Sequence, residues 1–104
     1  MERIYTSAQQ LIGNTPLLRL CRLEKAENLS AAVLAKMEMY NPAGSVKDRA
    51  ALYMLDDAEK KGLITKDTII VEPTSGNQGI GLSLVGAVRG YKTKIIMPDS
   101  VSEE

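Results

Sequence analysis

Two short apolar runs in the second half of the chain have the length and composition of buried strands. They are TIIV at Thr68–Val71 and KIIM at Lys94–Met97, and a proline follows each within two residues. Strands that are covered on both faces are apolar throughout, so both runs predict buried strands. The segment Asn77–Arg89 between them predicts a helix that Gly90 ends. This order predicts a βαβ unit in which the two strands are parallel neighbours.

A second helix is predicted over Ser45–Lys61, before the βαβ unit. Ser45 is a suitable N-cap, with Asp48 three residues later as a variant of the capping box, and Gly62 follows the last turn. Four apolar residues recur at helical spacing and predict the buried stripe of this helix: Val46, Ala50, Met54 and Ala58.

The first third of the chain predicts two further strands. Thr15–Leu20 has the pattern of a short strand entered through a proline, and Ala31–Met39 that of another, although its alanines also permit a helix. Near the end, Ser100 precedes Glu103 by three residues, the pattern of a capped helix start. The expected fold is α/β, with three parallel or near-parallel strands and two flanking helices, in a domain that we expect to be incomplete.

The composition is that of a globular domain. Hydrophobic residues make up 44% of the 104 positions and charged residues 25%. Thirteen basic residues balance thirteen acidic ones without a basic run, so nucleic-acid binding lacks its electrostatic basis. No apolar segment approaches the roughly 20 residues that span a bilayer. The first residues lack the apolar core of a signal peptide, and we therefore expect a cytoplasmic protein.

The residue types that are missing exclude several kinds of chemistry. There is no histidine and one cysteine, Cys21, so histidine-based nucleophile pairs and the usual zinc sites cannot form. We expect no metal. Cys21 is interpreted as a small filler of the core or of an edge, because free cysteines mostly behave as small hydrophobic residues. Lysine, carboxylates, hydroxyls, amides and glycine-rich loops remain for chemistry.

The loop EPTSGNQGIG at Glu72–Gly81 joins the first buried strand to its helix. Ligands of open α/β sheets lie beyond the carboxyl ends of the strands, and main-chain N–H groups at a helix start bind anions. Its glycine spacing matches neither a dinucleotide fold nor a Walker A loop, so the residues predict a site for a small anion such as a carboxylate. Alternatively, the glycines let the helix approach the sheet and the hydroxyls merely cap it.

Lys47 lies at the expected start of the first long helix, two residues after Ser45. The positive end of the helix dipole disfavours a positive charge there. Either Lys47 is a solvated side chain that the first turn tolerates, or the protein requires a neutral amine at this position.

Four motifs, taken together and in order, resemble the cysteine synthase family of fold-type II pyridoxal phosphate enzymes, which includes cystathionine β-synthase. They are IGNTPL (Ile12–Leu17), NPAGSVKDR (Asn41–Arg49), EPTSGN with GIGL (Glu72–Leu82) and MPDS (Met97–Ser100). The resemblance implies pyridoxal phosphate as the cofactor. It also implies that residues 1–39 are an N-terminal arm with strands that pack on a large domain. Residues 40–104 would be part of a small α/β domain.

The resemblance also implies roles for individual residues. Lys47 would bind the cofactor covalently and then act as the general base, and Asn77 would hydrogen-bond the phenolic oxygen of the cofactor. The carboxylate of the amino-acid substrate would be held by the loop residues Thr74, Ser75, Gly76, Asn77 and Gln78. The implied reaction replaces the acetate of O-acetyl-L-serine by sulfide and gives L-cysteine, and the implied assembly is a homo-oligomer.

Two departures from the family pattern limit these expectations. Gln78 stands where cysteine synthases usually carry threonine, and the chain ends before the loop expected to hold the cofactor phosphate. We therefore expect little turnover from this chain alone. The alternatives are an interaction module that uses unpaired apolar residues (Ile4, Leu11, Leu17, Leu18 and Leu20), or another lyase of the family, such as a cystathionine β-synthase or a serine or threonine dehydratase.

Overall fold

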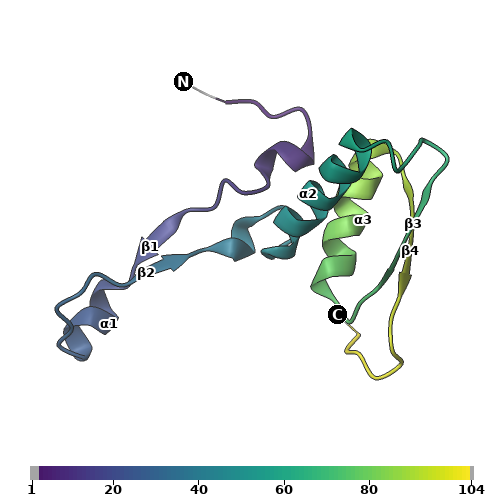
Figure 1. Ribbon diagram of the computed structural model, residues 1–104. Helices are drawn as coiled ribbons and strands as arrows, with labels where there is room; N and C mark the ends of the chain where they lie inside the picture. Colours follow the sequence, from purple (N-terminus) through teal and green to yellow (C-terminus); the bar gives the residue numbers. More distant parts are fainter. Residues whose placement is uncertain (1–2, 104) are drawn as a thin grey trace.

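A computed structural model describes residues 3–103 of the chain. The strands and α-helices form two parts, the first over residues 17–36 and the second over residues 47–96 (Figure 1). In order the elements are η1 (Ala8–Leu11), β1 (Leu17–Arg19), α1 (Cys21–Ala26), β2 (Leu34–Lys36), η2 (Glu38–Tyr40), α2 (Lys47–Lys60), β3 (Ile69–Pro73), α3 (Asn77–Arg89) and β4 (Lys92–Ile96).

The predicted βαβ unit is confirmed. Strands β3 and β4 pair in parallel, with Ile69 opposite Lys92, and α3 has the predicted bounds. Gly90 ends α3 in the left-handed conformation, at φ 81°. Burial alternates along both strands, because α3 packs on one face of this sheet and no other described element covers the second face. The expectation that the strand at Thr68–Val71 is covered on both faces is therefore wrong.

The two N-terminal strands are confirmed as short strands, but they do not join the parallel pair, so the expectation of three parallel or near-parallel strands is wrong. Strand β1 pairs antiparallel with β2 in a separate two-stranded sheet, with Leu17 opposite Lys36. The connection folds into the six-residue helix α1 and turns back, so the second strand runs opposite to the first and lies beside it. Figure 1 shows this hairpin projecting away from α2 and α3. Cys21, the first residue of α1, is exposed, which contradicts its interpretation as a core or edge filler.

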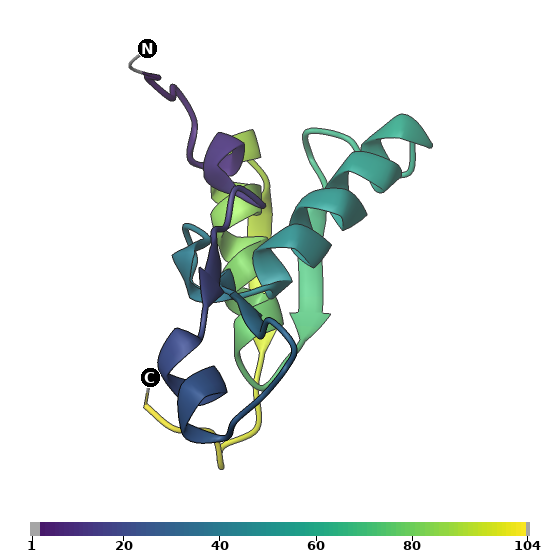
Figure 2. The same cartoon turned by 90° about the vertical axis from the view of Figure 1, so that its left-hand side faces the viewer.

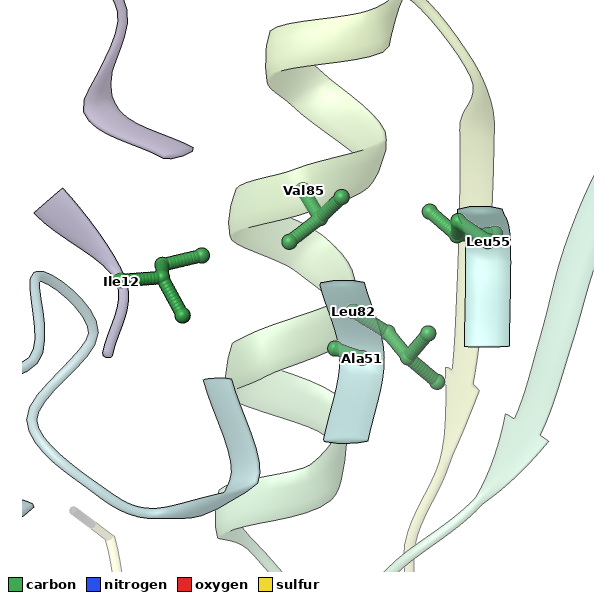
Figure 3. Packing of buried hydrophobic residues seen from close by; sticks show 5 residues of the cluster. All are labelled: Ile12, Ala51, Leu55, Leu82 and Val85. Carbon is green, nitrogen blue, oxygen red and sulfur yellow. The ribbon is translucent and has the colours of Figure 1, made fainter. Parts of the chain in front are cut away.

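The core lies mainly between α2 and α3 and is closed on one side by Ile12 (Figure 3). Its buried residues are Ile12, Ala51, Leu55, Leu82 and Val85. The predicted stripe of α2 is wrong, since Val46 and Met54 are half-exposed. The buried positions Ala51 and Leu55 follow two of the stripe residues by one position, a rotation of about 100° around a helix with 3.6 residues per turn. Figure 2 shows the two helices crossing at an angle.

Three glycines allow α3 to approach its neighbours on two sides. A Cβ atom at Gly79 would lie 2.9 Å from Ile95 Cγ2, and one at Gly86 would lie 2.6 Å from Thr93 Cγ2, both on β4. A Cβ atom at Gly81 would lie 2.9 Å from the carbonyl oxygen of Lys47 on α2. The alternative interpretation of the glycine-rich loop thus explains Gly79, which lets α3 pack closely on the sheet.

The chain exposes much more surface than a compact protein of its mass. Its accessible surface is 7825 Å² and its radius of gyration 17.5 Å, against about 5,700 Å² and about 13 Å for a compact chain of 11.3 kDa. Leu17 is 61% and Leu18 50% exposed, and Ile4 and Leu11 are exposed as well. Residues 98–103 form a turn and irregular chain without a helix, and Glu104 lies outside the described residues. Within residues 3–103 no helix has the length and apolarity needed to cross a membrane.

Candidate active site

Helix α2 begins at Lys47, and its first turn is held by hydrogen bonds from the preceding turn. The predicted N-cap is wrong, because Val46 and not Ser45 is the capping residue, but the Lys47 N–H still donates to Ser45 Oγ over 3.1 Å. The predicted capping box does not form. The carboxylate of Asp48 turns inward and its Oδ2 accepts the Ala43 N–H at 2.6 Å.

Asp48 is fully buried, and this determines its electrostatics. Burial raises the pKa of the Asp48 carboxyl, and the negative charge of Glu38 adds to the rise, while the hydrogen bond from Ala43 opposes it. The second oxygen, Oδ1, has no hydrogen-bond partner among the described residues. The Asp48 carboxylate thus links the NPAG turn to the start of α2 through one oxygen, while its other oxygen is buried without a hydrogen bond.

Arg49 joins the start of α2 to two distant segments. Its Nε donates to Glu38 Oε2 at 2.8 Å and its Nη2 to Glu38 Oε1 at 2.9 Å. The same Nη2 donates to the Gly13 carbonyl at 3.1 Å and to Thr15 Oγ1 at 3.0 Å. Thr15 in turn donates to Glu38 Oε1 at 2.8 Å. We call the group of Glu38, Arg49, Thr15 and Gly13 the clasp.

Charge and hydrogen bonding keep the clasp ionised. Arg49, with help from the Thr15 hydroxyl, lowers the pKa of Glu38 from 4.5 to about 2. Asn41 completes the arrangement, because its Nδ2 donates to Glu38 Oε2 at 2.9 Å and its Oδ1 accepts the Gly13 N–H at 2.8 Å. None of these residues has a role that was predicted from the sequence. Their signal was present, since four of them lie inside the IGNTPL and NPAGSVKDR motifs.

The loop before α3 leaves the first turn of this helix without a side-chain cap. Thr74 Oγ1 accepts the Gly76 N–H at 3.1 Å and shapes the turn into the helix. Gly76 is the capping residue and offers no side chain, so the N–H groups of the first turn receive no acceptor from the cap. An added Cβ atom at Gly76 would meet nothing within 4 Å, so the loop is open at this point. Such a helix start favours a bound anion.

A cleft of about 660 Å³ opens beside this loop, between the start of α3, the end of β4 and the C-terminal segment. Three of the predicted substrate-binding residues line it, namely Ser75, Gly76 and Asn77. Ser83, Ile95 and Met97 are among its other walls. Thr74 lines instead a neighbouring, shallower hollow of about 470 Å³, which it shares with Ser75.

The remaining predicted residues lie on the α2 side of α3. Gln78 Nε2 is 3.3 Å from Met54 Sδ, so the amide turns toward α2. Lys47 is exposed and does not line the cleft; its main chain reaches α3 at Gly81. The cleft therefore lies on one side of α3, and the start of α2 with Lys47 lies on the other side. The assignment of individual cofactor and substrate contacts stays a prediction.

Comparisons with known proteins identify the family. The family model for a pyridoxal-phosphate dependent enzyme matches residues 8–104. A probable cysteine synthase of Bacillus subtilis is 51% identical over all 104 residues, and a cystathionine beta-synthase of Apis mellifera is 52% identical over 93 residues. A hydrogen sulfide-producing enzyme of Fusobacterium nucleatum superposes over 99% of the chain, with a TM-score of 0.89 and 47% identity.

The chain belongs to the family of pyridoxal-phosphate dependent enzymes. It spans 33% of the length of the Bacillus relative, 18% of the Apis relative and 33% of the Fusobacterium structure. The predicted family, the α/β fold and the cofactor are confirmed. The residues present fit part of the cofactor, because Lys47 offers an accessible amine and the uncapped start of α3 offers N–H donors.

Proposed function

We propose that this chain carries the lysine-bearing and carboxylate-binding part of a cysteine synthase. The reaction would replace the acetyloxy group of O-acetyl-L-serine by sulfide, giving L-cysteine and acetate. The observation that supports this most strongly is the packing of two helix starts. Helix α2 begins with Lys47, and the Lys47 carbonyl lies against Gly81, four residues into the helix that begins with Asn77.

The cofactor, when bound, would supply an electron sink for the carbanion at the α-carbon of the substrate. Lys47 would bind it covalently and, once released, would take the α-proton at its Nζ and return it at a later step. Asn77, at the first position of α3, would donate from its side-chain amide to the phenolic oxygen. These roles need an amine and an amide on neighbouring elements, which the two helix starts provide.

The substrate carboxylate would bind at the loop that precedes α3. Ser75, Gly76 and Asn77 line the cleft and combine hydroxyl, main-chain and amide donors. Thr74 would act through the turn that its Oγ1 holds, and Gln78 through its main-chain N–H, because its side chain contacts Met54. The large exposed apolar surface supports a further proposal, that the working protein is a homo-oligomer.

A second candidate is the cystathionine β-synthase reaction, which the 52% identity to the Apis mellifera protein favours. Both reactions would use the same lysine and the same carboxylate loop. They differ in the incoming sulfur nucleophile, sulfide or a thiol of an amino acid. Competition between these two nucleophiles, measured with a full-length relative that carries residues 1–104 of this chain, would decide between them.

The proposal is tested by locating the cofactor on the chain. Purified chain is mixed with pyridoxal phosphate and treated with borohydride, which makes the link between cofactor and lysine permanent, and the label is mapped by peptide mass. We expect label concentrated on Lys47 and reduced in Asn77→Ala, with Lys47→Arg as the control for site assignment. Label distributed over the exposed lysines in proportion to their number would contradict the proposal.

A further inference from the structure

We propose that the clasp of Glu38, Arg49, Thr15 and Gly13 positions the Lys47 amine, an inference that rests on the proposed function of Lys47. Arg49 lies two residues after Lys47, in the first turn of α2. Its guanidinium makes four hydrogen bonds to the clasp, two of them to the Glu38 carboxylate. The clasp residues do not touch the cleft, so they would act through Lys47 and not on a ligand.

The need for such a device follows from the surroundings of Lys47. Its side chain is exposed, so the position of its amine depends mainly on the position of the main chain at Lys47. That main chain is the end of a helix, and helix ends fray when their groups lack partners. Here Lys47 N–H bonds only to a side-chain oxygen, Ser45 Oγ, and the next helical bond, from Asp48 N to Ser45 O, is 3.3 Å long.

The clasp meets this need because it ties two other segments to that first turn. Gly13 and Thr15 precede β1, Glu38 begins η2, and Arg49 belongs to α2. Among the described elements, neither β1, β2 nor η2 packs extensively on α2, so the clasp is the principal link between the hairpin and this helix. A loss of the link would loosen the first turn, which the hydrogen bonds of Ser45 and Asp48 would then hold alone, and would leave the core between α2 and α3 in place.

The same helix offers a matched control at its other end. Asp56 accepts a hydrogen bond from Arg89 Nη2 and joins α2 to α3, nine residues after Lys47. Like the clasp, this ion pair is partly exposed and links α2 to another segment. Its loss should lower stability without affecting the first turn.

The first measurement is amide hydrogen exchange of the whole chain, followed residue by residue. In Glu38→Gln and in Thr15→Val we expect exchange at Lys47, Asp48 and Arg49 to accelerate about tenfold, as for the loss of a charge-assisted hydrogen bond. Thr15→Ser, which keeps the hydroxyl, should restore the wild-type rates. Asp56→Asn should leave these three amides unchanged. Unchanged rates in Glu38→Gln and Thr15→Val, or an equal acceleration in Asp56→Asn, would overturn the positioning role.

The second measurement is the share of borohydride-fixed cofactor found on Lys47. We expect this share to fall in Glu38→Gln and Thr15→Val and to be kept in Thr15→Ser and Asp56→Asn. A wild-type chain without preferential label on Lys47 would contradict the proposed function, while the exchange rates would still decide whether the clasp holds the first turn. Preferential label that persists in Glu38→Gln would contradict the inference alone.

Discussion

The α-carbon of Gly81 lies against the main-chain carbonyl of Lys47, so close that a Cβ atom would stand 2.9 Å from that oxygen. The same added atom would stand 3.3 Å from the Cβ of Ala51, one turn further along α2. Real Cβ atoms do not approach a carbonyl oxygen this closely, and the neighbour on the α2 side is main chain, which yields less readily than a side chain. Glycine at position 81 therefore sets the spacing between the two helix starts.

Substitution Gly81→Ala should push the first turn of α2 away from α3. We expect a loss of about 1–3 kcal/mol in the free energy of unfolding, the usual cost of overpacking, together with a lower share of cofactor label on Lys47. Gly86→Ala is the control, because its Cβ atom would meet Thr93 on β4 at 2.6 Å and leave α2 untouched. It should lower stability but keep the label on Lys47. Equal labelling in the two variants would show that Gly81 has no special relation to the lysine.

The buried carboxylate of Asp48 predicts opposite effects for two substitutions. Asp48→Asn keeps an oxygen for the Ala43 N–H and removes a charge that burial disfavours, so it should raise the midpoint of thermal unfolding at pH 7. Asp48→Ala leaves that N–H without its acceptor and should cost about 1–3 kcal/mol.

The pH dependence of these variants follows from the direction of the shift. Since the pKa of Asp48 is raised on folding, its contribution to stability is complete at low pH and is lost as the pH rises through the folded-state value. The advantage of Asp48→Asn over the wild type should therefore grow with pH and vanish in acid. Denaturant unfolding of both proteins across the acidic range measures it. A wild type that gains stability relative to Asp48→Asn as the pH rises would contradict the assignment.

Glu38 predicts the reverse dependence. Its pKa falls from 4.5 to about 2 on folding, mainly through Arg49, so its contribution is complete above pH 4.5 and is lost as the pH falls toward 2. The wild type should be more stable than Glu38→Gln at pH 7, and the two should converge between pH 4.5 and about 2. Denaturant midpoints at a series of pH values test this. A difference that persists unchanged at pH 3 would rule out the ionised carboxylate as its source.

The small core makes its central residue sensitive to truncation. Leu82 is 2% exposed and packs between α2 and α3 in a cluster of five buried residues. Leu82→Ala should cost about 2–5 kcal/mol, since the residues around it cannot collapse fully into the cavity. Val88→Ala, at an exposed position of the same helix, is the control and should change the unfolding midpoint little. Similar losses of stability in the two variants would show that Leu82 is not a central residue of the core.

Local patterns were sufficient for the βαβ unit. Helix α3 has the bounds that its composition and Gly90 predict, and β3 and β4 follow from two apolar runs with prolines behind them. The resemblance of the motifs to a family of pyridoxal phosphate enzymes is confirmed as well. These features depend on neighbours in the chain, on turn-forming residues and on the short connection between parallel strands.

Long-range contacts decided the rest. The buried face of α2 is displaced by one residue from the predicted stripe: Asp48 turns inward to Ala43, and Ala51 and Leu55 are buried where the stripe predicted Ala50 and Met54. The antiparallel hairpin and the clasp likewise join residues more than ten positions apart, which no local periodicity can indicate. By itself the sequence determined the types of the main elements, the family and the candidate lysine. Only the tertiary structure decided which faces are buried and which polar groups meet, because those depend on where separate segments come together in space.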